Sequence, residues 1–315
     1  MGRSAAAVQL GPGSLVEAYI GYETPHGRML CGTVEEALDN RWLDTYKGRT
    51  DLIFTSPPFP LSRPKRYGNK TGDEYVEWLT GLAPRLAKLL APKGSLVIEI
   101  GNAWEPGKPI MSTLSLEALL AFLKSSGLQL CQQFICHNSA RLPGPAQWVN
   151  VERIRVKDSY THVWWMAKTD RPKANNKNVL TPYSPEMKRL LRTKRYNAGT
   201  RPSGHFIGAE TFLTDNGGAI PSSVLQYSNT WWNADYIQHC KKLKVKPHPA
   251  RMQPGLAEFF IKFLTDERDL VLDPFAGSNT TGAVAESLKR RWVAIEPEAD
   301  YVRTSRARFA NLGLK

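Results

Sequence analysis

The chain has 315 residues, of which 42% are hydrophobic and 10% aromatic. This length and composition are enough to bury a sizeable core, and they exclude a disordered tail or a disulfide-stapled miniprotein. Its 42 Lys and Arg residues outnumber 29 Asp and Glu residues, and the net charge of +13 favours a polyanionic partner. The four cysteines form no CxxC pair and no His/Cys cluster, so we expect neither disulfides nor a metal site. No apolar run reaches about 18 residues and the N-terminus lacks a secretion signal, so we expect no membrane span and a cytoplasmic location.

Short apolar runs alternate along the chain with longer segments that carry apolar residues at helical spacing. This order is typical of an α/β fold in which helices cover the faces of a sheet. The predicted strands are Arg28–Cys31, Asp51–Thr55, Ser95–Ile100, Leu128–His137, His162–Ala167, Asp269–Asp273 and Trp292–Ile295. The predicted helices are Asp73–Leu90, Leu114–Leu123, Gly255–Leu264, Thr280–Leu288 and Glu298–Phe309. Trp164 and Trp165 are expected in the core, on opposite faces of their strand.

The tetrapeptide Ser56-Pro57-Pro58-Phe59 directly follows the predicted strand Asp51–Thr55, which places it at the carboxyl edge of the sheet, where open α/β folds bind ligands. Two successive prolines fix the backbone and lack N–H donors, so the turn is rigid and its carbonyls are free to accept hydrogen bonds. The Ser56 hydroxyl and the Pro57 carbonyl can each accept one hydrogen of an exocyclic amino group, while the Phe59 ring stacks on the base. We therefore predict that these four residues are catalytic.

The segment from Asp170 to Ala250 departs from the alternation of strands and helices. It is rich in proline, glycine and asparagine, and its 13 Lys and Arg residues against 5 Asp and Glu residues supply eight of the chain's 13 net positive charges. Aromatic rings and a histidine are interleaved with these charges, as on surfaces where bases stack. They are Tyr183, Tyr196, His205, Trp231 and Trp232. The alternative to a nucleic-acid surface is a solvated insertion loop.

A second motif follows the predicted strand Asp269–Asp273, where the sequence DPFAGSNTTG turns into the predicted helix Thr280–Leu288. Gly277 allows a ligand to approach the backbone closely, and free N–H groups at the start of the helix suit a carboxylate. Glu296 ends the next strand, where an acidic side chain can accept both hydrogen bonds of a ribose diol. With Asp273, these residues fit a cofactor that has an amino-acid end and a nucleoside end, which describes S-adenosylmethionine (SAM) better than a dinucleotide.

TSPPF and DPFAGSNTTG, in this order, resemble the amino-methylating DNA methyltransferases of the β arrangement, in which the catalytic tetrapeptide precedes the cofactor motif. Within that family the chain is similar to the PvuII-type N4-cytosine enzymes, on RPKRYGN, RPSGH and HPAR and over most of the chain from about Tyr19 onward. In this family SPPF usually accompanies N4-cytosine, whereas DPPY usually marks N6-adenine. The resemblance implies a seven-stranded, Rossmann-like methyltransferase fold, SAM as donor, and cytosine in double-stranded DNA as acceptor.

The resemblance also implies how the chain is divided. Residues 1–169 would form the catalytic half, residues 170–246 a target-recognition insertion, and residues 247–315 the SAM-binding half that completes the catalytic domain. The cofactor residues that it implies are Asp273, Phe275, Gly277, Ser278, Asn279, Thr280 and Glu296. Asn279 stands where the family more commonly has glycine, although the PvuII-type pattern shares SNTTG.

The expected reaction is direct in-line methyl transfer to the amino group of a cytosine that is rotated out of the duplex, at a cost of roughly a few kcal/mol. No strong base accompanies the tetrapeptide, so Ser56 is expected to orient the amino group rather than to deprotonate it. None of the four cysteines follows a proline, which disfavours the cysteine-nucleophile route of carbon-5 methylation.

Basic side chains would hold the DNA. The predicted phosphate contacts, just after the tetrapeptide, are Arg63, Lys65 and Arg66. The candidates for contacts to base edges, within the insertion, are Arg201, Ser203 and His205. We therefore expect double-stranded DNA as partner, association with the nucleoid, and, in a restriction-modification system, a cognate endonuclease that acts on the same site without direct contact.

Three alternatives stay open at this point. One is an N6-adenine methyltransferase on the same scaffold, and another is a non-catalytic DNA-binding relative, which the intact Ser56, Gly277 and Glu296 disfavour. The third is methylation of RNA or of protein glutamine, which uses related NPPY-like turns.

Overall fold

The computed structural model describes residues 19–59, 70–227 and 234–312. The predicted phosphate contacts Arg63, Lys65 and Arg66 lie outside these residues, and so do Trp231 and Trp232.

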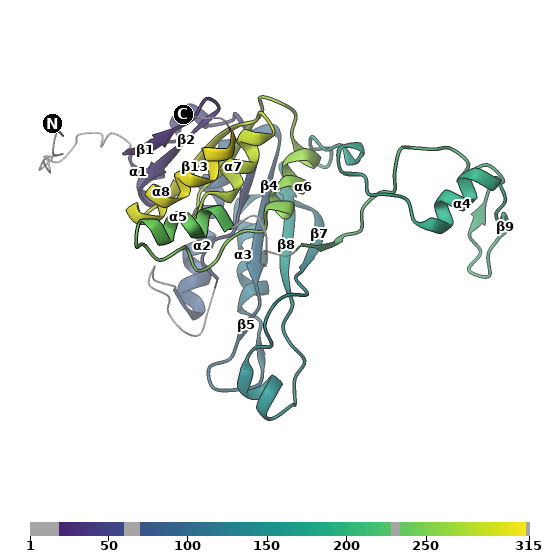
Figure 1. The fold of residues 1–315 in the computed structure, drawn as a ribbon, viewed down its shortest axis with the longest axis horizontal. Helices are drawn as coiled ribbons and strands as arrows, with labels where there is room; N and C mark the ends of the chain where they lie inside the picture. Colours follow the sequence, from purple (N-terminus) through teal and green to yellow (C-terminus); the bar gives the residue numbers. More distant parts are fainter. Residues whose placement is uncertain (1–18, 60–69, 228–233, 313–315) are drawn as a thin grey trace, which may run out of the picture.

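Within the described chain, a nine-stranded sheet has the order β1-β2-β13-β12-β3-β4-β8-β7-β11 (Figure 1). Its strands are β1 (Ile20–Glu23), β2 (Gly27–Cys31), β3 (Thr50–Thr55), β4 (Leu90–Gly101), β7 (Gln129–His137), β8 (Tyr160–Ala167), β11 (Val224–Gln226), β12 (Leu270–Asp273) and β13 (Arg291–Glu296). From β2 to β4 the strands are parallel, β8 is antiparallel to its neighbours β4 and β7, and β11 is parallel to β7. All seven predicted strands are present, and β1 and β11 add one short strand at each edge.

Helices cover both faces of this sheet. On one face are α1 (Val34–Asp39), α2 (Gly72–Leu89) and α3 (Leu114–Ser126). On the other are α6 (Pro254–Leu264), α7 (Thr280–Ser287) and α8 (Ala299–Ser305), with α5 (Ala234–Lys242) against α8. The predicted helix Glu298–Phe309 is α-helical only to Ser305 and continues as 3-10 turns over Arg306–Leu312. None of the described helices is long and apolar enough to cross a membrane.

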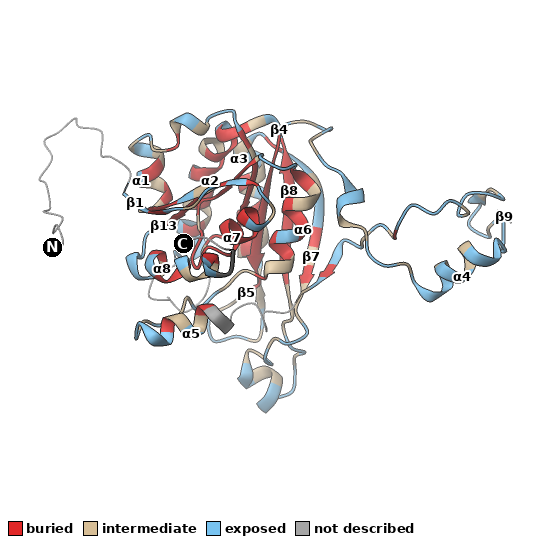
Figure 2. Cartoon of the chain, turned by 45° about the horizontal axis from the view of Figure 1, so that its top comes forward, coloured by how far each residue is buried: buried red, intermediate tan, exposed pale blue. Residues whose placement is uncertain are grey.

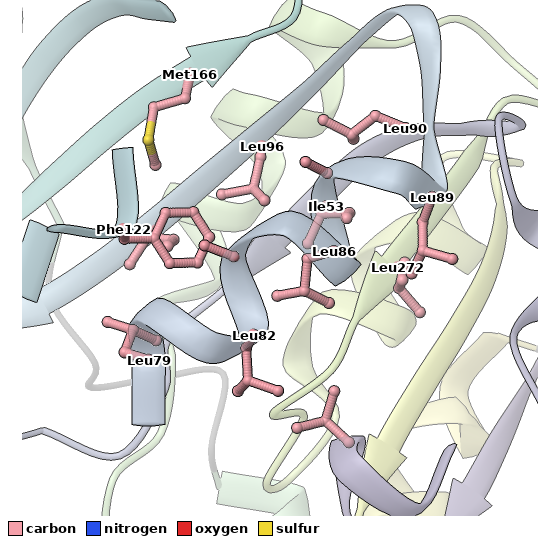
Figure 3. Packing of buried hydrophobic residues seen from close by; sticks show 14 of the residues in the cluster. Ile53, Leu79, Leu82, Leu86, Leu89, Leu90, Leu96, Phe122, Met166 and Leu272 are labelled. Atoms are coloured by element: carbon pink, nitrogen blue, oxygen red, sulfur yellow. The ribbon is translucent and has the colours of Figure 1, made fainter. Parts of the chain in front are cut away.

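The sheet separates two hydrophobic clusters. Leucines on successive turns of α2 pack with Ile53 of β3 in the first cluster (Figure 3). Leu52 and Phe54, the sequence neighbours of Ile53, belong to the second cluster because successive strand side chains point to opposite faces. For the same reason Trp164 and Trp165 fall in different clusters, which confirms their predicted placement. A core on both faces holds the strand ends in fixed positions.

Two parts of the chain extend from this body (Figures 1 and 2). The arm, residues 182–218, contains α4 (Pro185–Thr193) and a hairpin of β9 (Gly199–Thr200) and β10 (Phe206–Ile207). The lobe, residues 102–112 and 138–159, contains a hairpin of β5 (Ala103–Trp104) and β6 (Met111–Ser112) and the π-helical turn Gln147–Val151. Among the described residues of the predicted insertion 170–246, the arm projects, whereas β11 joins the main sheet and α5 packs against α8.

Candidate functional site

A cavity of about 570 Å³ lies at the carboxyl ends of β3, β4, β12 and β13. It brings the SPPF turn after β3 together with the DPFAGS turn after β12, two motifs that are far apart in the sequence. The predicted catalytic and cofactor residues that line it are Ser56, Pro57, Pro58, Phe59, Asp273, Phe275, Gly277, Ser278 and Glu296. Asn279 and Thr280 are not among the lining residues. The edge of the sheet on which the sequence placed both motifs is therefore the edge that carries the cavity.

A glycine on the neighbouring strand makes room for the Phe59 ring. A Cβ atom at Gly101, the last residue of β4, would lie 2.6 Å from the Phe59 ring. The ring therefore fills the space that a side chain at this position would need. Gly101 thus allows the half-buried aromatic ring to line the cavity beside Ser56.

A buried carboxyl group, which the sequence analysis missed, lies beside Ser56. Glu99 is 4% exposed and accepts a hydrogen bond of 2.8 Å from Thr161 Oγ1. Burial raises the pKa of Glu99, while the hydrogen bonds with Thr161 and Ser56 and the charge of Arg141 act in the opposite direction. The signal was present in the sequence, because Glu99 is the one acidic residue in the apolar run SLVIEI. A charged residue in a strand buried on both faces needs polar partners, and such partners gather at sites.

Asp273 connects the two motifs. It ends β12 and accepts hydrogen bonds from Thr55 Oγ1 at 2.7 Å, from Thr281 Oγ1 at 2.7 Å and from the amide of Phe275 at 3.1 Å. Burial raises the pKa of this carboxyl group against the effect of its three donors. Because Thr55 precedes the SPPF turn, Asp273 ties the SPPF turn to the DPFAGS turn across the cavity.

Glu296 ends β13, next to the DPFAGS turn. Its two oxygens accept hydrogen bonds from the amides of Gly277 at 2.9 Å and Glu298 at 3.1 Å. Burial raises the pKa of Glu296 to about 7. A carboxylate at a strand end in the cavity is the group that the sequence predicted for a ribose diol.

Asn279 forms the turn into α7 rather than the wall of the cavity. Its backbone is left-handed, with φ of 53° and ψ of 45°, which asparagine tolerates better than most residues. Its Oδ1 caps the helix by accepting from the Gly282 amide at 3.1 Å, and its Nδ2 donates to the Tyr22 hydroxyl at 2.8 Å. The cofactor contacts predicted for Asn279 and for Thr280, the buried first residue of α7, stay predictions.

Several buried polar atoms of the cavity residues have no hydrogen-bond partner among the described residues. These atoms are Tyr75 Oη, Arg251 Nε and Gln253 Oε1. The cavity also has an aromatic wall, in which the rings of Trp78 and Phe275 meet edge to face at 5.5 Å between centroids. Buried polar atoms are normally satisfied, so this set suits a ligand that has both donors and acceptors.

The three candidates for base contacts lie on the arm, away from the cavity-lining residues. Arg201 and His205 close the turn between β9 and β10, where the Arg201 amide donates to the His205 carbonyl at 2.8 Å. The Arg201 guanidinium donates to the carbonyl of Asn197 at 2.6 Å, while Ser203 and His205 are exposed. The turn is therefore ordered by its own hydrogen bonds and presents two of the three side chains to solvent.

Over residues 50–307, the sequence matches the model of a protein family described as DNA methylase. The chain belongs to this family. The methylase is 43% identical over 290 residues to the type II methyltransferase M.PvuII of Proteus hauseri. The aligned region covers 91% of this chain and 85% of that relative. It is 23% identical over 268 residues to the type II methyltransferase M.BglII of Bacillus subtilis, covering 84% and 64% of the two chains.

Solved structures also resemble the methylase. The PvuII DNA methyltransferase, described as cytosine-N4-specific, matches with a TM-score of 0.75 and 35% identity over 95% of this chain and 92% of that chain. The complex of M1.HpyAVI with SAM shares the fold, with a TM-score of 0.53 and 19% identity over 90% and 99% of the two chains. The match to the PvuII structure confirms the predicted fold class.

Proposed function

We propose that this methylase transfers a methyl group from SAM to the exocyclic N4 amino group of cytosine in double-stranded DNA. The observation that carries the proposal is that one cavity holds both the SPPF turn and the DPFAGS turn. The identity of 35% with a cytosine-N4-specific enzyme, over 95% of the chain, favours cytosine over adenine as the acceptor. The relatives are type II methyltransferases, which supports the proposal that the protein serves a restriction-modification system, with a cognate endonuclease that acts on the same site.

The residues of the cavity fit SAM. Glu296 offers carboxylate oxygens to a ribose diol, and the Trp78 and Phe275 rings offer an apolar surface to an adenine. Gly277 has φ of 53°, and a Cβ there would lie 3.0 Å from the His248 ring, so a side chain at this position would strain the backbone and crowd this wall of the cavity. Gln253 Oε1, which has no hydrogen-bond partner in the described part of the chain, adds an acceptor for the ammonium or amino groups of such a ligand.

The chain's own residues orient the acceptor. When bound, SAM supplies an electrophilic methyl group on its sulfonium centre. Ser56 donates its hydroxyl hydrogen to the Glu99 carboxylate, so the lone pairs of the Ser56 oxygen are free to accept one hydrogen of the cytosine amino group. The Pro57 carbonyl accepts the second hydrogen, and the Phe59 ring stacks on the base.

The buried Glu99 offers a destination for the proton of the amino group, whereas the tetrapeptide itself contains no strong base. The amino nitrogen needs no base before it attacks, because its N–H becomes acidic only once the nitrogen carries positive charge. That proton then passes to the Ser56 oxygen as the Ser56 hydrogen moves to Glu99. Burial already raises the pKa of Glu99, so its neutral form is well tolerated in this cavity.

The arm and the chain just after the SPPF turn would bind the DNA. The turn of the arm presents Ser203 and His205 to solvent near Arg201, in the segment where most of the net positive charge is concentrated. Arg63, Lys65 and Arg66 remain our candidates for phosphate contacts. We propose that these contacts offset the cost of rotating the cytosine out of the duplex and keep the protein associated with the nucleoid.

The direct test is to incubate the protein with radiolabelled SAM and duplex DNA, digest the DNA and identify the labelled nucleoside. N4-methylcytosine supports the proposal. N6-methyladenine would replace the proposed acceptor, and label in RNA or protein that resists DNase would replace the substrate class. SAM binding without label transfer to any of these acceptors would identify a non-catalytic relative.

A further inference from the structure

Apolar side chains are exposed on the lobe, next to the cavity. Their exposed fractions range from 54% to 88%, and they are Ile110, Leu142, Val151, Ile154 and Val156. Single exposed apolar residues are ordinary, but several on one small part of the chain indicate a surface that binds a partner molecule. The exposed cations Lys108, Arg153 and Lys157 outnumber the exposed Glu152 on the lobe, so the surface suits an anionic partner with apolar parts, such as DNA.

Leu142 differs from the other four because of its neighbour. It is 85% exposed and directly follows Arg141, which lines the cavity. None of the other four is adjacent in sequence to a cavity-lining residue. Leu142 is therefore the exposed apolar residue of the lobe that the chain connects directly to the wall of the cavity.

The loop that carries this leucine is held in place by side-chain and backbone contacts. Arg141 donates to the Tyr160 carbonyl at 3.1 Å and forms an ion pair with Asp158 at 3.5 Å. The amide of Asn138 donates to the carbonyl of Ser159 at 2.8 Å. The loop is thus fastened to the chain that enters β8, and the leucine is exposed without being on a free end.

On the basis of the cytosine methylation proposed above, we propose that Leu142 inserts into the DNA stack and fills the space that the rotated cytosine leaves. Rotation of a base opens an apolar gap between its two stacked neighbours, and proteins that distort DNA place leucine and similar side chains in such gaps. A leucine has no hydrogen-bonding group, so it suits a gap between any pair of bases. Arg141, which faces the cavity on the same loop, would then lie on the path of the extruded base.

The test compares Leu142→Ala on two duplexes. The first is a matched duplex that the wild type methylates, and the second lacks the base opposite the target cytosine, which makes extrusion cheaper. On the matched duplex, we expect the single-turnover rate to fall on the order of tenfold, because most of the buried apolar surface is lost. On the duplex with the abasic site, we expect a loss of less than about twofold, because the gap no longer has to be stabilised to the same extent. Leu120→Ala, which truncates an exposed leucine on α3, should be neutral on both duplexes.

The outcomes separate this inference from the function on which it rests. Failure of the wild type to methylate cytosine would reject the proposed function before any variant is compared. If the wild type is active, equal losses of Leu142→Ala on both duplexes would show a structural effect and overturn the inference. A rate on the matched duplex within twofold of the wild type would overturn it as well.

Discussion

The Ser56 hydroxyl hydrogen-bonds with the Glu99 carboxyl group, and in the proposed reaction the Ser56 oxygen accepts a hydrogen of the substrate amino group. Replacement by alanine, Ser56→Ala, removes an acceptor for the amino group and one partner of Glu99. We expect turnover to fall by at least about tenfold, with SAM affinity unchanged, because the cofactor side of the cavity keeps its residues. Label-transfer rates and calorimetric SAM binding measure the two effects. Thr161→Ala, which removes another partner of Glu99 but no proposed substrate contact, should lose less, and a Ser56→Ala rate within twofold of wild type would contradict the assignment.

Glu296 makes stability depend on pH in a defined direction. Burial raises its pKa from 4.5 to about 7, so ionising it costs the folded state more than the unfolded state. Its stabilising contribution is complete below pH 4.5 and is lost as the pH rises to about 7, a difference of about 3 kcal/mol. Glu296→Gln cannot titrate. When urea unfolding is measured at pH 4.5 and at pH 7, the free energy of unfolding of the wild type should therefore fall by about 3 kcal/mol more than that of this variant. If the free energies of unfolding of the two proteins change with pH in parallel, the pKa of the carboxyl group is not perturbed.

At the scale of elements, the strands that form the site were predictable and the edges of the sheet were not. β3 and β12 are apolar at successive positions because both of their faces are buried, and the two motifs follow directly from their ends. β11 has three residues and forms because the edge of β7 offers a pairing partner, which no local pattern encodes. α1 is six residues long, too short for a periodic signal, although its capping box of Thr33 and Glu36 could have been recognised.

The start of α7 explains why asparagine can replace glycine in the cofactor turn. Asn279→Ala would lose the cap on Gly282, strain the left-handed backbone and leave the Tyr22 hydroxyl without this donor, at a total cost of about 2–3 kcal/mol. Asn279→Gly loses the same hydrogen bonds, but glycine adopts the left-handed backbone conformation without strain. We therefore expect it to be about 1 kcal/mol less destabilising in chemical denaturation, and an alanine variant as stable as the glycine variant would contradict this account.

At the scale of the whole molecule, the arm can be separated from the body, which contains the cavity. The chain closes at the base of the arm, where the amides and carbonyls of Thr181 and Ala219 exchange two hydrogen bonds of 2.9 Å. Between them, residues 182–218 contribute no described side chain to either hydrophobic cluster, and α4 has no buried residue. The same segment has six Lys and Arg residues against three Asp and Glu residues. The arm therefore adds charge and surface but little to the stability of the body.

This separation predicts the result of replacing residues 182–218 with Asn-Gly. A two-residue turn of this kind joins an antiparallel pair that exchanges both hydrogen bonds, which is the geometry between Thr181 and Ala219. The shortened protein should fold, bind SAM with unchanged affinity and melt within a few degrees of the wild type, because both hydrophobic clusters are intact. Its DNA binding should weaken, and its preference for the recognised duplex over a scrambled duplex should fall to about one, since the candidates for base contacts are removed. Competition binding measures that preference, and a shortened protein that still prefers the recognised duplex would locate sequence recognition outside the arm.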